Sequence, residues 1–201
     1  MDEKSPGERR HTKIRQEILD AARTIINEQG VDGLSMRTLA ERVNYSPAAL
    51  YNYFDSKEEI VEAIRAEGWA LSAAMQEDLP RDLPLPELLY RQGLAYLKFA
   101  EAYPDYYLLM MSPSDNVPAN MATFIGSPNF RELVDFVEAA VASGGIALPP
   151  GYTPLHVAFL MWFLVHGISM LKLTLMRDCQ PEFDEISAQV LRGLVEAFVG
   201  G

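Results

Sequence analysis

The chain has 201 residues, of which 49% are hydrophobic and 22% are charged, a balance typical of a globular protein with one or two domains and a sizeable core. Its single cysteine, Cys179, excludes an intramolecular disulfide framework and a cysteine-rich metal site, so we interpret it as structural. The formal net charge of −11 is unusual for a nucleic-acid-binding protein, whose affinity rests largely on phosphate neutralisation.

The N-terminal segment, residues 1–12, is polar and lacks the apolar core of a signal peptide, so we expect a cytoplasmic protein. We predict that this segment is a flexible basic arm. Two roles fit it: contact with the phosphates or the minor groove of a nucleic acid, or a solvated tail with no binding role. Residues 13–29 then predict a first helix that ends at Gly30. The basic residues in and beside the arm are Arg9, Arg10, Lys13 and Arg15.

The stretch from Ser35 to Lys57 predicts two short helices joined by a tight turn. Ser35 is a predicted cap for the first of them, because its hydroxyl can accept a hydrogen bond from a free backbone N–H. Asn44 is expected to end that helix, since asparagine tolerates the left-handed conformation. The chain therefore reverses direction just after residue 44.

The second short helix begins with Ser46 and Pro47. A capping hydroxyl followed by proline is a strong start signal, because the N–H that proline lacks would be unpaired at that position anyway. Leu50 and Phe54, four residues apart, are expected to anchor this helix to a core and leave its other side exposed. Two helices, a three-residue turn and an exposed second helix predict a helix-turn-helix.

Charge is unevenly distributed along the chain. Residues 9–57 contain eight basic and six acidic residues, a net charge of +2, whereas residues 68–201 contain seven basic and fifteen acidic residues, a net charge of −8. We expect the basic end to meet DNA while the acidic remainder limits nonspecific binding.

A long helix is predicted after the helix-turn-helix. Ser56 and Glu59 form a capping-box pattern at its start, and residues 58–79 would connect the N-terminal region to the body of the chain. Three prolines in residues 80–86 cannot continue a helix and mark the boundary. In the body we predict helices over about 87–102, from Pro104, over 129–142, from Pro154 to about Arg177, and over the last twenty residues, with an irregular loop at 112–128.

The helix that starts at Pro154 is apolar nearly all round and long enough to raise the question of a membrane span. His166 and Lys172 interrupt it, and an amphipathic helix follows, so we predict no membrane insertion. A helix that is apolar on every side must be covered on every side.

Residues 34–64, LSMRTLAERVNYSPAALYNYFDSKEEIVEAI, resemble the DNA-binding signature of TetR-family transcriptional regulators, in which a capped helix with a Leu-Ala pair precedes L-Y-x-[HY]-F and K-E-E-[LI]. Asn44-Tyr45 departs from the usual glycine and small apolar residue. Trp162 to Gly167 is similar to the W-x-x-x-H-G pattern of a subgroup of these proteins. The resemblance implies an all-α fold with a helix-turn-helix DNA-binding domain at 13–57 and a ligand-binding and dimerisation domain at 80–201.

The same resemblance implies a set of DNA contacts on the helix-turn-helix. Phosphate contacts suit Lys57 and the hydroxyls of Ser46, Tyr51 and Tyr53. Asn52 and Arg37 suit base edges, and the alanines offer only methyl contacts. Tyr53 has an alternative interpretation, in which its ring packs against the first helix instead of contacting DNA. The candidate DNA contacts are Arg37, Thr38, Ser46, Ala48, Ala49, Tyr51, Asn52, Tyr53 and Lys57.

A ligand site within the C-terminal helices is implied as well, lined by aromatic and methionine side chains that would otherwise be plain core. His166 fits two roles: a buried group bonded to a neighbour, or a ligand contact. Three widely spaced histidines do not indicate a metal site. The candidate lining residues are Phe99, Tyr103, Tyr106, Tyr107, Met110, Phe130, Trp162, His166 and Met170.

These features predict a transcriptional regulator without cofactor, a homodimer through its last two helices that represses from a palindromic operator until a small apolar ligand releases it. The alternative is a dimeric ligand-binding or interaction protein that does not read DNA. An enzyme fits less well, because His166 and Ser169 are not accompanied by a Gly-x-Ser-x-Gly elbow, a metal set or a phosphate loop.

Overall fold

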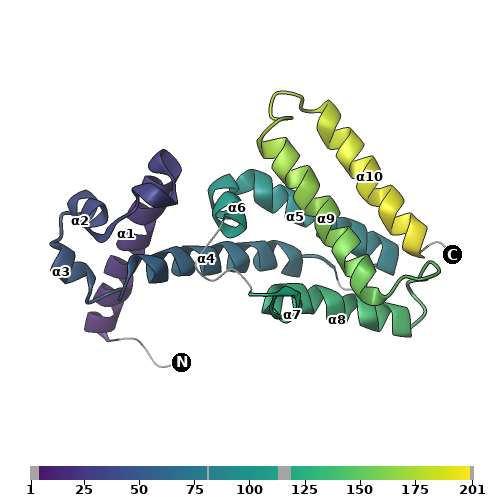
Figure 1. The fold of residues 1–201 in the computed structure, drawn as a ribbon, viewed down its shortest axis with the longest axis horizontal. Coiled ribbons are helices and arrows are strands. Elements are labelled where there is room, and N and C mark those ends of the chain that lie inside the picture. Colours follow the sequence, from purple (N-terminus) through teal and green to yellow (C-terminus); the bar gives the residue numbers. More distant parts are fainter. Residues whose placement is uncertain (1–4, 81, 113–118, 200–201) are drawn as a thin grey trace. The chain divides into compact units, whose positions relative to one another are not determined.

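The computed structural model describes residues 5–80, 82–112 and 119–199, and every regular element in these ranges is a helix (Figure 1). The predicted all-α fold is confirmed. The chain divides into two compact units, residues 1–70 with 105–115 and residues 71–104 with 116–201. The predicted block at 80–201 is therefore interrupted, since residues 105–115 belong to the first unit.

The first unit holds the helix-turn-helix and the helices that support it. Its core includes Ile18, Leu39, Leu50, Phe54 and Ile60, all of them almost fully buried. Four of these side chains come from four different helices and Phe54 comes from the segment after the second short helix, so the short helices are held by packing rather than by their own propensity. The helices are α1 (Pro6–Gln29), the 3₁₀ helix η1 (Val31–Gly33), α2 (Met36–Val43), α3 (Pro47–Leu50), the first part of α4 (Lys57–Glu77) and α6 (Pro104–Met111).

Helix α1 starts earlier than the sequence analysis predicted. Ser5 Oγ accepts a hydrogen bond from Glu8 N at 3.2 Å, and Ser5 N donates to Glu8 Oε2 at 2.7 Å, which makes a complete capping box ahead of Pro6. The predicted flexible arm is wrong for residues 6–12, which are helical, and residues 1–4 lie outside the described residues. Gly30, at φ 74°, is the predicted C-cap, and its N–H donates to Ile26 O.

The second unit contains the five remaining helices and the end of α4. Helix α7 lies within the predicted irregular loop at 112–128, and this part of the prediction is wrong. Asn120 Oδ1 starts α7 by accepting a hydrogen bond from Thr123 N at 2.9 Å. Helix α9 ends at Leu173 rather than near Arg177. The helices are α5 (Leu85–Ala102), α7 (Met121–Ile125), α8 (Pro128–Ala142), α9 (Pro154–Leu173) and α10 (Glu182–Val199).

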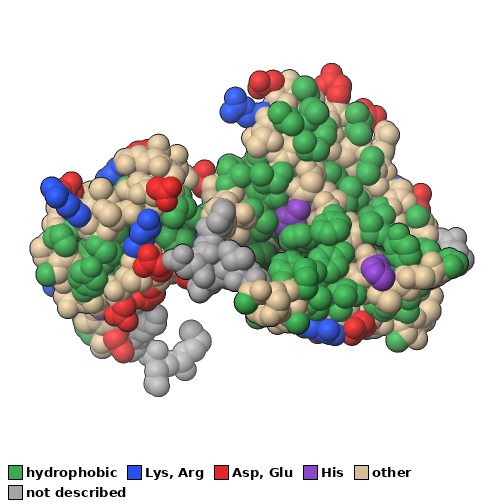
Figure 2. Space-filling model, viewed as in Figure 1, with side chains coloured by type: hydrophobic (Ala, Val, Ile, Leu, Met, Phe, Trp, Pro, Cys, Tyr) green, Lys and Arg blue, Asp and Glu red, His purple; other side chains and the backbone are tan. Residues whose placement is uncertain are grey.

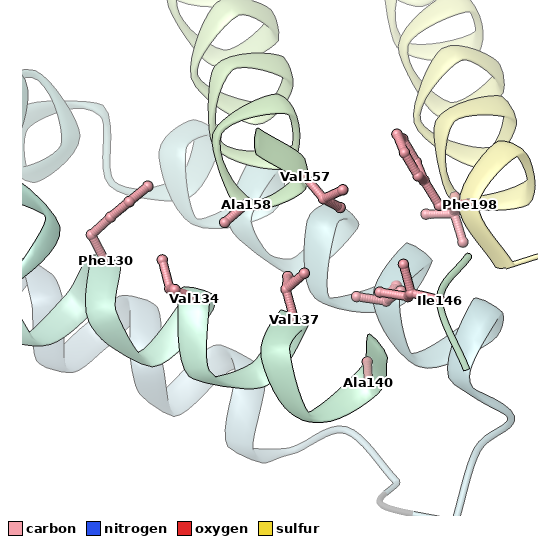
Figure 3. Packing of buried hydrophobic residues seen from close by; sticks show 10 residues of the cluster. Phe130, Val134, Val137, Ala140, Ile146, Val157, Ala158 and Phe198 are labelled. Carbon is pink, nitrogen blue, oxygen red and sulfur yellow. The ribbon is translucent and has the colours of Figure 1, made fainter. Parts of the chain in front are cut away.

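The core of the second unit lies between α8, α9 and α10. Figure 3 shows Val134 and Val137 on α8 directed toward Val157 of α9, with Phe198 of α10 close by. These side chains are almost fully buried, so their apolar surface is removed from water at about 25 cal/mol per Å². The core fixes the N-terminal half of α9.

Helix α9 is the one helix in the described ranges that is long and apolar enough to cross a membrane by length and composition, and a single such helix is weak evidence. Its C-terminal half carries Lys172, a buried residue whose Nζ lies 2.9 Å from Glu101 Oε2 on α5 and 2.7 Å from Asp184 Oδ1 on α10. Burial lowers the pKa of Lys172, but hydrogen bonds to Asp184 and Glu101 outweigh this and raise it. The ion pairs tie α5, α9 and α10 together.

Candidate DNA interface and interior polar site

The turn of the helix-turn-helix is built by side-chain caps. Ser35 Oγ accepts from Thr38 N at 3.0 Å, and Thr38 Oγ1 accepts from Ser35 N at 2.9 Å. Asn44 is left-handed, with φ 56° and ψ 40°, as predicted. Because Thr38 Oγ1 also lies within hydrogen-bond distance of Gly33 O, the structure gives Thr38 a capping role that the sequence analysis did not foresee.

Helix α3 is a single turn whose orientation depends on two buried side chains. Ser46 Oγ accepts from Ala49 N at 3.2 Å, which confirms the predicted cap. Helical-type hydrogen bonds continue past the helix end, since the N–H groups of Tyr53 and Phe54 both donate to Leu50 O. Leu50 and Phe54 are buried, as predicted.

The opposite side of α3 and the turn after it face solvent. Tyr51 is 54% exposed, and Ala48 and Asn52 are exposed beside it. Ala49 is half-buried, so its methyl group is less available than predicted. Tyr53 is also half-buried, and its ring centroid lies 4.7 Å from that of His11 on α1, which supports the packing reading of Tyr53.

One face of the Phe54 ring is covered by a charged side chain that belongs to a hydrogen-bonded network. The Arg15 guanidinium lies 4.1 Å above the centre of the Phe54 ring, and Arg15 Nη2 pairs with Glu59 Oε1 at 3.3 Å. Glu59 Oε2 accepts from Asp55 N at 2.6 Å, while Glu59 N donates to Ser56 Oγ at 3.2 Å. The predicted capping box at α4 is thus half right, because the Glu59 carboxylate binds the N–H of Asp55 instead of that of Ser56.

Most of the basic residues counted in the sequence have acidic neighbours. Five of the eight form ion pairs within the first unit, including Arg37 with Glu41 at 3.2 Å. These pairs are at least partly exposed and contribute little stability, so a phosphate can replace the carboxylate at small cost. Residues 1–70 and 105–115, which make up this unit, contain ten basic and fifteen acidic residues, a net charge of −5, so the excess of basic residues is confined to part of the unit.

Three candidate lining residues, Tyr106, Tyr107 and Met110, lie on α6 and belong to the first unit. The Tyr106 hydroxyl donates to Glu67 Oε2 at 3.0 Å and also hydrogen-bonds to Arg23. Tyr107 is fully buried. The remaining six candidates lie in the second unit, so the predicted ligand site is not brought together within one unit.

An aromatic cluster in the second unit surrounds His166. The His166 ring centroid lies 4.4 Å from the Trp162 ring and 5.1 Å from the Tyr96 ring, and His166 Nε2 is 3.3 Å from Tyr96 Oη. Phe99, which is fully buried, lies beside Tyr96 with ring centroids 6.0 Å apart. Sequence reasoning missed Tyr96, although its position three residues before Phe99 on α5 placed it on a neighbouring part of the same helix surface.

The other predicted lining residues differ in how far they are buried. Phe130 is buried and packs edge-on against Trp162, with ring centroids 6.0 Å apart. Tyr103 and Met170 are 38% and 39% exposed, which differs from the predicted enclosed lining. Figure 2 shows that hydrophobic side chains cover much of the surface of this unit over α9.

His166 should make stability depend on pH. Burial lowers its pKa from 6.5 to about 4, since a buried imidazolium loses its hydration. Between these values the unfolded chain binds one more proton than the folded chain. The free energy of unfolding should therefore fall by about 3 kcal/mol as the pH drops through this window. Urea unfolding at several pH values, in the parent and in His166→Gln, measures the difference, and parallel curves would contradict it.

The side chains of α3 and of the turn after it are exposed, while capping hydrogen bonds and buried anchors hold the helix-turn-helix in place. This arrangement defines a DNA-binding protein of the helix-turn-helix class. Residues 18–64 match the family model "Bacterial regulatory proteins, tetR family", and residues 89–197, more than half of the chain, match "Tetracyclin repressor-like, C-terminal domain". The chain belongs to the TetR family of DNA-binding transcriptional regulators.

Curated relatives match parts of the chain. It is 28% identical over 90 residues to the uncharacterised HTH-type transcriptional regulator YobS of Bacillus subtilis, which covers 45% of this chain and 47% of YobS. It is 41% identical over 49 residues to IcaR of Staphylococcus aureus, a biofilm operon negative transcriptional regulator, which covers 24% of this chain and 26% of IcaR. The chain thus spans half or less of the length of these two relatives.

Solved structures share the fold over nearly the whole chain. A protein of unknown function from Rhodococcus sp. RHA1 has a TM-score of 0.72 at 24% identity, with 92% of this chain and 95% of that chain covered. A TetR variant from Acinetobacter baumannii AYE in complex with minocycline has a TM-score of 0.59 at 20% identity, with 90% and 94% covered. At these identities the likeness concerns the fold.

Proposed function

We propose that the protein is a cytoplasmic, homodimeric repressor that binds a palindromic operator through α3 and is released from it by a small, largely apolar ligand. The observation that carries the proposal is the exposed surface of Ala48, Tyr51 and Asn52, held rigidly by the buried Leu50 and Phe54. The name of IcaR, a negative regulator that resembles the N-terminal region, supports repression.

The chemistry of the exposed residues divides the contacts. Asn52 presents an amide that can pair with an adenine edge, and Ala48 presents a methyl group suited to thymine. Tyr51 and Lys57 suit phosphates, which position the protein on the duplex. Arg37 on α2 can exchange Glu41 for a base edge, because that ion pair is exposed. Ser46 and Thr38 contribute mainly by holding the turn.

The proposed dimer uses the outer faces of α9 and α10. Phe163 on α9 and Ile186 and Val190 on α10 are exposed apolar residues, 57%, 56% and 49% accessible. A second copy placed on this face would remove them from water, and two-fold symmetry would match a palindromic site. The ligand would favour one spacing of the two DNA-binding units, and its effect cannot exceed its preference for that state.

Electrophoretic mobility shifts on the promoter DNA next to the gene, at increasing salt, test this function. The parent should bind specifically with a steep loss of affinity as salt rises, because phosphate contacts release counterions. The double variant Tyr51→Ala, Lys57→Ala should bind at least about tenfold more weakly. Circular dichroism would show whether the double variant is folded. Tyr45→Ala, in the exposed turn, is the matched control.

If the variant bound as tightly as the parent, the assignment of α3 as the reading element would be wrong. If the parent failed to bind the adjacent promoter and also failed to select any sequence from random DNA, the protein would be a ligand-binding or interaction protein that does not read DNA.

A further inference from the structure

The interior of the second unit contains a line of polar side chains along one face of α9. His166, Ser169 and Lys172 are spaced three residues apart, and all three are buried, with Ser169 only 1% exposed. Residues at this spacing lie one above the other on a helix surface. The surrounding α9 sequence is apolar, so the line is a polar strip inside a hydrophobic unit.

Two of these side chains have partners that account for their burial. Lys172 is held by Glu101 and Asp184, at 2.9 and 2.7 Å. His166 lies 3.3 Å from the Tyr96 hydroxyl and packs against the Trp162 ring. Their polar atoms are thus used in holding α5, α9 and α10 together.

Ser169 is different. Its Oγ is the one buried side-chain nitrogen or oxygen in the described residues that has no hydrogen-bond partner. A serine in the middle of a helix ordinarily satisfies its hydroxyl by bonding to the carbonyl one turn back, and a buried hydroxyl that bonds to nothing is destabilising. Such a group needs an explanation, and a bound molecule that supplies the missing partner is one.

Aromatic rings lie next to the polar side chains of this strip. Trp162 lies one turn before His166 on α9, and Phe99 lies beside Tyr96 on α5. On the outer side, Trp162 packs edge-on against Phe159, which lines an open hollow of about 540 Å³. That hollow is lined also by Met121 and Phe163, and Trp162, whose ring contacts both Phe159 and His166, links it to the cluster.

We propose that Tyr96, His166 and Ser169 form the polar end of a binding site for an uncharged aromatic molecule that carries a hydroxyl group, such as a phenol or an aromatic alcohol. The inference rests on the proposed function, because it assigns the chemical class of the effector. The flat rings of Trp162 and Phe99 suit an aromatic body, and the three polar groups suit a single hydroxyl that both donates and accepts.

The charge states of His166 and Lys172 explain why the bound molecule should be uncharged. The His166 imidazole is neutral at pH 7, since burial lowers its pKa to about 4, and it offers no positive charge to a carboxylate. Lys172, the cation on the same face, is already bound to two carboxylates. A carboxylate ligand would therefore lose its hydration without gaining a cation, and it should bind more weakly than the corresponding alcohol.

The test uses 2-naphthol and 2-naphthoate, which share a skeleton and differ in charge at pH 7. In the full-length Trp69→Phe protein, Trp162 is the only tryptophan, so quenching of its fluorescence reports binding at this cluster. We expect 2-naphthol to quench saturably and 2-naphthoate to bind at least about tenfold more weakly. Ser169→Ala should weaken 2-naphthol binding about tenfold, the effect of one hydrogen bond to a buried group.

Ser187→Ala is the matched control. Ser187 is buried on α10, but its hydroxyl donates to Phe183 O at 2.6 Å, so its loss should lower the melting temperature and leave binding unchanged. Ser169→Ala should keep or raise the melting temperature, because it removes an unsatisfied group. A purely structural role for Ser169 would give the stability change without the binding change.

The proposal is overturned if 2-naphthol fails to bind, if Ser169→Ala binds it as the parent does, or if 2-naphthoate binds as tightly as 2-naphthol. These measurements contain no DNA, so they are independent of the mobility shifts. Operator binding without 2-naphthol binding would overturn only the ligand class, and 2-naphthol binding without operator binding would overturn only the repressor.

Discussion

Replacing Phe54 with alanine should lower the free energy of unfolding of the first unit by about 3–5 kcal/mol and abolish operator binding. Phe54 is 1% exposed, and the Arg15 guanidinium lies 4.1 Å above its ring. Its loss would leave a cavity and remove the surface on which Arg15 rests. Helix α3 has only four residues and cannot form alone, so Tyr51 and Asn52 would lose their fixed position.

Urea unfolding followed by circular dichroism measures the stability of the Phe54→Ala variant, and mobility shifts at a temperature where it remains folded measure its DNA binding. Phe54→Leu is the matched control, since it keeps an apolar side chain of similar size and should lose less than half as much. If Phe54→Ala lost less than about 1 kcal/mol, Phe54 would not be the anchor that its burial indicates.

The local chemistry of the helix-turn-helix was predictable because it depends on neighbouring residues. Ser35, Asn44 and Ser46 adopt the caps and the left-handed turn that their types favour. The same reasoning could have found the start of α1, since Ser5 and Glu8 form a capping box around a proline. The basic composition of that segment outweighed this signal and led to the wrong prediction of an arm.

Features that depend on contacts distant in sequence were not predictable. The assignment of α6 to the first unit rests on pairs such as Tyr106 with Glu67 and Arg23, which are 39 and 83 residues apart. The partner of Arg15 is likewise 44 residues away. A charge count along the sequence does not show which of these charges the fold brings together in pairs.

The sequence predicted some residues of the interior polar site and not others. His166 and Trp162 were identified by a motif, but Tyr96 and Ser169 were not singled out as lining residues, because tyrosine and serine on a helix carry no special spacing. Burial decides their importance: Ser169 matters because its hydroxyl is enclosed without a partner. An unsatisfied hydrogen-bonding group is a property of the fold and has no sequence signature.

Replacing Val190 with glutamate should convert the proposed dimer into a monomer. Val190 is 49% exposed on α10 and borders a shallow apolar hollow whose other side is formed by Leu160 and Phe163 of α9. In a two-fold interface each substitution occurs twice, so two carboxylates would enter one apolar contact without cations, at a cost of several kcal/mol. The dissociation constant of the dimer should rise at least about a hundredfold.

Sedimentation velocity at micromolar protein measures the change, and Gln189→Glu is the matched control. Gln189 is exposed on the same turn, next to the apolar face, and the substitution adds the same charge, so this variant should remain dimeric. The Val190→Glu monomer should also lose operator affinity, because one helix-turn-helix reads only half of a palindrome. If Val190→Glu stayed dimeric, the two copies would associate through a different surface, and the apolar face of α9 and α10 would need another partner.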